Sequence, residues 1–249
     1  MSNTTRLGNT DIVNIAKQRF DKQQRSKLPS IIVNLPSAGS VYPKDHVLAS
    51  GQVEMRYMTA YDEDILTNAS YLREGVIFDK LLEALVISDI DIADIVSADR
   101  DALIINARIV SYGSEYPVQV QSPAGNTIDA IVDLKNIHAK PFELISDDNG
   151  EFSYELESGT KLKFAYATTV TSTSVSELLK NIIREVDGDR SATRINEFIR
   201  YEFLAGDAKR FRNYVEKNAP GLDFIYEFEG EDGGTFKAMF PVGADLFWF

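Results

Sequence analysis

The chain has 249 residues, 44% of them hydrophobic, which is enough apolar material for one large domain or two small ones. A net charge of −12 disfavours contact with phosphate backbones and anionic lipid surfaces, so we expect neither nucleic acid nor a membrane as partner. The absence of cysteine excludes disulfides and thiolate metal sites, and no apolar run reaches the roughly 18–20 residues that a bilayer span needs.

Residues 1–28 differ in charge from the rest of the chain. They carry six basic and two acidic residues, a net charge of +4, whereas the remainder carries −16. They lack the apolar stretch of a signal peptide, so we expect a soluble, cytoplasmic protein. Thr10 or Asp11 could cap a short helix with a narrow apolar stripe. This basic arm either packs on the acidic body of its own chain or folds as a docking helix on a partner.

Strands and a tight loop are predicted next. Ile31–Val33 suit a short strand, and Leu35-Pro36-Ser37-Ala38-Gly39 followed by Tyr42-Pro43 suits a loop, because proline fixes φ and glycine accepts positive φ. The segment His46–Met58 predicts a pair of strands joined by a turn at Ser50-Gly51.

A strand-to-helix corner follows, within the sequence VEMRYMTAYDEDIL at Val53–Leu66. Its first residues alternate between apolar and polar, as a strand does, and Thr59 or Asp62 can cap the helix that follows. Asp62, Glu63 and Asp64 then lie at the positive end of that helix. The same acids could form a divalent metal site, but three consecutive side chains at a helix start point in different directions. We therefore interpret them as helix-start residues.

Helices and a hairpin complete the first half. We expect helix over residues 62–85 with a break at Glu74-Gly75, and a helix over residues 100–110. Ser97 or Asp99 would cap the second helix and Gly113 would end it. Residues 116–121 and 127–132 then alternate as two strands around a turn.

The second half repeats this order of elements after a connector at residues 136–141. A hairpin is predicted over residues 152–166, and threonines and serines at 168–173 stand where the first half has acids. Helices follow over residues 174–185, 192–203 and 208–217, and a final hairpin is expected at residues 224–240.

An offset of roughly 108 residues aligns the two halves. It places Tyr116–Val120 on Phe224–Phe228 and Gly125 on Gly233. The sequence therefore predicts an α+β fold of two similar units, each with β-hairpins flanking a small set of helices. The predicted divisions are a basic arm at 1–28, a first unit at 29–140 and a second unit at 141–249.

Catalytic signatures are missing from the sequence. It holds two histidines, no Gly-x-Ser-x-Gly elbow and no glycine-rich phosphate loop, and we expect no cofactor and no bound metal. A metal-dependent hydrolase using Asp62, Glu63 and Asp64 is the remote alternative to a protein without enzymatic activity.

Three motifs together resemble the baseplate hub family of T-even-like, contractile-tailed bacteriophages, which includes a hub subunit and a hub assembly protein. They are Leu35-Pro36-Ser37-x-Gly39-x-x-Tyr42, Met58-Thr59-x-x-Asp62-Glu63 and the closing Phe247-Trp248. Several relatives carry paired cysteines in the turns of the two hairpins that follow the capped helices. This chain has no cysteine there, so the hairpins must hold by turns and packing alone.

The resemblance implies an assembly factor for the central baseplate hub, or alternatively a permanent structural subunit of it. Its partners would be other hub proteins, met in the host cytoplasm during tail assembly and in the tail baseplate of the virion. The sequence leaves the oligomeric state open. The side chains expected to contact partners are Leu35, Pro36, Tyr42, Met58, Asp62, Glu63, Phe247, Trp248 and Phe249. The aromatic C-terminus either docks as an edge strand on its own core or anchors a partner.

Overall fold

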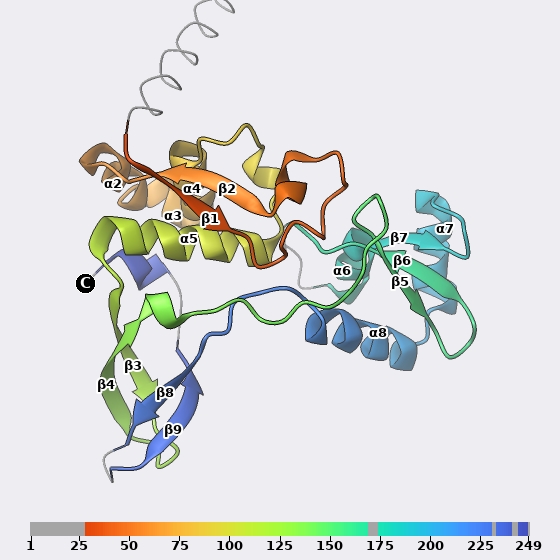
Figure 1. The fold of residues 1–249 in the computed structure, drawn as a ribbon. Coiled ribbons are helices and arrows are strands. Elements are labelled where there is room, and N and C mark those ends of the chain that lie inside the picture. Colours follow the sequence, from red (N-terminus) through yellow and green to blue (C-terminus); the bar gives the residue numbers. More distant parts are fainter. Residues whose placement is uncertain (1–27, 169–173, 231–232, 241–243, 249) are drawn as a thin grey trace, which may run out of the picture.

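The computed structural model describes residues 28–168, 174–230, 233–240 and 244–248. This part of the chain is a mixed α+β fold with four small antiparallel sheets and seven α-helices (Figure 1). Three predicted segments lie outside these residues: the basic arm except for Leu28, the threonine and serine segment at 168–173 except for Thr168, and Phe249. No helix in the described ranges is long and apolar enough to cross a bilayer.

The first sheet joins two strands that lie far apart in sequence. β1 (Ser30–Asn34) pairs with β2 (Gln52–Arg56), with Val33 opposite Val53. The predicted strand pair within His46–Met58 is therefore wrong. Residues Val47–Ser50 form a 3₁₀ helix, η1, because the His46 side chain accepts a hydrogen bond from the Leu48 amide and so caps its start.

Four α-helices and a short 3₁₀ turn follow β2 and supply the main core of the first half. They are α2 (Ala60–Leu66), α3 (Ala69–Glu74), α4 (Ile77–Leu85), η2 (Ile92–Asp94) and α5 (Ser97–Tyr112). The predicted break is confirmed, since α3 ends at Gly75 in the left-handed region. Leu81, Leu82 and Leu103 are completely buried between the helices and the first sheet. The predicted cap of α5 is wrong: Val96 is its N-cap residue, and Asp99 makes other contacts.

Two hairpins lie side by side at one end of the molecule (Figure 1). One joins β3 (Glu115–Gln121) to β4 (Thr127–Asp133), which η3 (Leu134–Asn136) follows, and the other joins β8 (Ile225–Glu229) to β9 (Thr235–Met239). Both were predicted from alternation and turn residues, and both are confirmed. Their inner faces meet through aromatic rings, as in the edge-to-face contact of Tyr116 with Phe240.

The remaining sheet has three strands, β5 (Phe152–Glu155), β6 (Lys161–Phe164) and β7 (Ile183–Val186). It packs with α6 (Val175–Ile182), α7 (Ala192–Glu197), the π-helical turn η4 (Phe198–Glu202) and α8 (Ala205–Lys217). The helix predicted to continue to residue 185 ends at Ile182. Ile183 and Val186 are buried in the pairing with β6, which gives β-branched residues a better environment than another helical turn would.

The last hairpins of the two halves share a register, whereas the first strand pairs do not. An offset of 108 residues carries the pair Pro117–Ile131 onto the pair Ile225–Met239, and the N-cap residue Val96 of α5 onto the N-cap residue Leu204 of α8. Val86, which follows α4, makes a single antiparallel bridge to Met55 in β2. In the second half, the strand β7 follows α6 and pairs with β6 over several residues.

Segments from the two halves also contact each other. A bridge between Ala139 and Leu222 pairs the two connecting segments, and η5 (Ala244–Phe247) returns to α5. The division at residue 140 stays a prediction.

Candidate partner-binding surfaces

The acidic corner is built around a buried ion pair. Arg56, at the end of β2, donates two hydrogen bonds to the Asp62 carboxylate, at 2.7 and 2.8 Å. Asp62 also accepts from the Thr59 amide and hydroxyl, both at 2.8 Å, which ties the helix start to the strand. Burial alone would raise the pKa of Asp62, but the hydrogen bonds from Arg56 and Thr59 outweigh it and hold that pKa below its ordinary value. The carboxylate thus holds the corner together from inside the protein.

The neighbours of Asp62 differ in exposure. Glu63 is exposed and accepts a 2.7 Å hydrogen bond from the Tyr112 hydroxyl. Burial and that carboxylate raise the pKa of Tyr112 to about 12. Met58 is half-buried against the core. The described residues contain no group of three or more acids or histidines arranged to hold a metal ion.

The loop at residues 35–43 closes over a second buried carboxylate, Asp99, in the first turn of α5. Asp99 accepts from the Ser37 amide at 2.9 Å, the Ser37 hydroxyl at 2.6 Å and the Tyr42 hydroxyl at 2.7 Å. The Tyr42 oxygen in turn accepts from the Val96 amide at 3.1 Å. Burial raises the pKa of Asp99 despite these hydrogen bonds, and burial beside Asp99 raises the pKa of Tyr42 as well. Ser37 and Tyr42 therefore fasten the loop to α5.

The same loop contacts the connector between the two halves, which in the structure runs from the end of η3 to the start of β5, residues 137–151. Gly150 lies so close to the loop, with a φ of +73°, that a Cβ there would meet the Val41 carbonyl oxygen at 2.6 Å. Lys44 forms an ion pair with Asp148 at 2.6 Å, and the Ser146 hydroxyl donates to the Ser40 carbonyl. Leu35, Pro36 and Tyr42 of this loop are buried.

The C-terminal segment docks on the first half of its own chain. It does so as the 3₁₀ turn η5 and not as the expected edge strand. The Phe247 ring is buried and contacts the rings of Phe78 and Tyr112, whereas Trp248 is 36% exposed. The Leu246 carbonyl accepts from Nε of Arg108 at 2.9 Å.

Arg108 is a completely buried residue that sequence analysis missed. Its guanidinium also donates to the carbonyls of Gly113 at 2.6 Å and Glu115 at 3.1 Å, so it joins the end of α5, the start of β3 and the C-terminal turn. Nothing in the local pattern distinguishes this arginine from a surface residue of an amphipathic helix.

These contacts divide the nine predicted partner-contact residues. Five of the side chains are buried: Leu35, Pro36, Tyr42, Asp62 and Phe247. Glu63, Trp248 and the half-buried Met58 present side-chain surface, and Phe249 lies outside the described residues.

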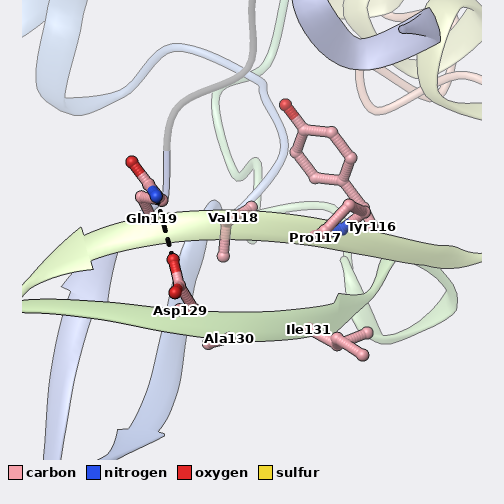
Figure 2. Close-up of a pocket in the computed structure, with 7 residues that line it drawn as sticks. All are labelled: Tyr116, Pro117, Val118, Gln119, Asp129, Ala130 and Ile131. Atoms are coloured by element: carbon pink, nitrogen blue, oxygen red, sulfur yellow. Dashed lines mark hydrogen bonds between the residues drawn. The ribbon is translucent and has the colours of Figure 1, made fainter. Parts of the chain in front are cut away.

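A more open apolar surface lies on the hairpins, which sequence analysis did not single out. A hollow on β3 and β4 is lined from Tyr116 to Gln119 and from Asp129 to Ile131, as Figure 2 shows. A 2.9 Å hydrogen bond from Gln119 to Asp129 links the strands, and Ile131 is 63% exposed. On the second hairpin, the facing residues Ile225 and Met239 are 54% and 70% exposed. Each hairpin thus presents an apolar pair at the same register position.

The described part of the chain is thus a mixed α+β protein with exposed apolar pairs on two hairpins. The model of the family described as T4 bacteriophage base plate protein matches residues 29–203. The chain belongs to this family and is a bacteriophage baseplate protein. No match was found among curated proteins or among solved structures.

Proposed function

We propose that this baseplate protein promotes assembly of the central hub of the baseplate through protein contacts, without enzymatic activity. The observation that supports the proposal is the pair of hairpins with outward apolar pairs, Pro117 with Ile131 and Ile225 with Met239. Exposed apolar groups in repeated register are typical of surfaces that another protein covers. In a baseplate the available partners are other baseplate proteins, so hub proteins are the occupants we expect.

The described side chains favour binding over chemistry. Asp62 is engaged by Arg56 and Thr59, and the His46 ring caps η1, so neither is held ready for substrate. Of the predicted contact residues, Met58, Glu63 and Trp248 present side-chain surface that can add to the partner surface. The proposed places of action are the host cytoplasm during tail assembly and the tail itself.

The duplication belongs to the same proposal. We infer that the units at 29–140 and 141–249 are two versions of one α+β unit, preceded by a basic arm. The shared registers of the hairpins, the matching N-caps of α5 and α8, and the equivalent positions of Val86 and β7 support this. A duplicated unit places two similar hairpins side by side, which gives the partner surface its two parts.

Two measurements on phage-infected cells test the proposed role. Disrupting the gene should leave cells without assembled hubs, as seen by electron microscopy of sedimented tail intermediates. In a separate measurement on tails from wild-type phage, mass spectrometry should detect little of this chain if it acts transiently. Stoichiometric presence in finished tails would instead support a permanent structural subunit, and normal hubs without the gene product would contradict both roles.

A further inference from the structure

A cationic groove lies in the second half, away from the hairpins. It is a hollow of about 450 Å³ between α6, the end of α7 and the π-helical turn η4, lined by Ser176, Lys180, Asn196, Ile199 and Arg200. Ser176 and Lys180 are one helical turn apart on α6, and Arg200 lies within η4. Turns of π-helix are rare and occur frequently at functional sites, because the extra residue redirects the side chains around it.

The charge of the groove is opposite to that of the chain as a whole. Its lining holds two cations and no carboxylate, in a chain of net charge −12. Glu202 pairs with Arg194, outside the lining, whereas Glu177 pairs with Lys180 of the groove itself at 2.9 Å, so Arg200 is the lining cation that is open to a ligand. Across the described ranges Arg200 has no acidic partner, and its guanidinium lies over the Tyr201 ring at 5.3 Å. A guanidinium in this setting is ready to receive a carboxylate through two hydrogen bonds.

Apolar surface adjoins these cations. Ile199 is half-buried in the lining, and Tyr201, the residue after Arg200 in η4, is 71% exposed. Val175, next to Ser176, is also exposed. Tyrosine and arginine are enriched among the residues that contribute most to binding energy at protein interfaces. The groove therefore combines a charged contact with room for an apolar side chain.

We infer that this groove binds a short acidic segment of another protein. A carboxylate of the segment would bind Arg200 with Lys180 beside it, and a neighbouring apolar side chain would rest on Ile199. A long polyanion such as nucleic acid fits less well, because the net charge of residues 29–249 is strongly negative and repels it on either side of the groove. The inference does not depend on the proposed role in hub assembly.

A site-specific binding experiment can test this, because the chain has no cysteine. Ser176→Cys, labelled with an environment-sensitive fluorophore, reports from inside the groove, and Asn213→Cys, exposed on α8, provides a reference label. The probe is the capped peptide Gly-Glu-Leu-Glu-Phe-Glu-Gly, compared with a version in which glutamine replaces every glutamate. We expect a saturable change at the groove label only, about tenfold stronger binding of the acidic peptide, and weaker binding as salt rises.

Two variants with the same loss of charge separate the groove from general electrostatics. In the labelled protein, Arg200→Gln should weaken peptide binding about tenfold, whereas Lys209→Gln, exposed and outside the groove, should change it less than about twofold. Circular dichroism should show both variants folded, since both side chains are exposed. Equal effects of the two variants, no saturable signal at millimolar peptide, or tighter binding of a thymidine oligonucleotide at the groove label would overturn the inference.

Discussion

Replacing Gly150 by alanine probes the contact that joins the connector to the loop at residues 35–43. A Cβ at this position would lie 2.6 Å from the Val41 carbonyl oxygen and 2.7 Å from the Tyr42 carbonyl carbon. Both atoms are backbone, so neither can move without displacing the loop. Gly150 also has a φ of +73°, which alanine adopts at a cost of roughly 1 kcal/mol. Forcing a methyl group into a filled space adds about 1–3 kcal/mol. We therefore expect Gly150→Ala to lower the free energy of unfolding by about 2–4 kcal/mol.

Gly159→Ala supplies a matched control within the same chain. Gly159 has a φ of +88°, but a Cβ there would meet nothing within 4 Å. Its substitution should therefore cost only the conformational part, roughly 1 kcal/mol. Urea unfolding followed by circular dichroism, with the m-value checked for constancy, measures both costs. Equal losses in the two variants would refute the close packing of the connector on the loop.

Three further predictions follow from the buried contacts. Asp99→Ala removes the acceptor for the Ser37 amide, the Ser37 hydroxyl and the Tyr42 hydroxyl, so the free energy of unfolding should fall by about 3–5 kcal/mol. The control Asp94→Ala, at an exposed residue, should lower it by under about 0.5 kcal/mol. A loss below about 1 kcal/mol for Asp99→Ala would contradict the buried cluster. Asp62 has a lowered pKa when folded, so its stabilisation is complete above the pKa of an unfolded aspartate and is lost as pH falls through the folded pKa. Asp62→Asn should be less stable at neutral pH and should show a flatter loss of stability on acidification, and an unchanged pH profile in denaturant titrations would contradict this. Phe247→Ala should cost about 3 kcal/mol because its buried ring contacts Phe78 and Tyr112, whereas Trp248→Ala should cost under about 1 kcal/mol; thermal unfolding that shows equal costs would reject the docked position of η5.

Short-range patterns predicted the local structure well. The hairpin strands at 115–121 and 127–133 follow from strict alternation around a glycine turn, and the break after α3 follows from Gly75. Longer-range features had no local signal. Seventeen residues separate β1 from β2, and Asp99 lies 62 residues from Ser37. Neither pairing can be inferred from spacing within one segment.

The partner candidates show a related limit. Leu35, Tyr42 and Phe247 stand out in the sequence motifs, yet their side chains pack inside the protein. The motifs contain residues that stabilise the fold. The exposed apolar pairs on the hairpins lie outside the motifs and consist of residue types that are common in strands. Ile131 and Met239 could be separated from core residues only once the pairing of the hairpins was known.

In the role we propose, the outward hairpin residues bring baseplate proteins together. The most direct measurement is the yield of assembled hubs, by electron microscopy, from cells infected with phage that carries both Ile131→Asp and Met239→Asp. The control is Ile145→Asp, which places one such charge at a side chain that is 92% exposed on the connector, and it is compared also with each hairpin substitution singly. We predict a loss of assembled hubs with the hairpin variant and normal yield with the control. Normal hubs in the presence of a stable, correctly folded hairpin variant would contradict the claim.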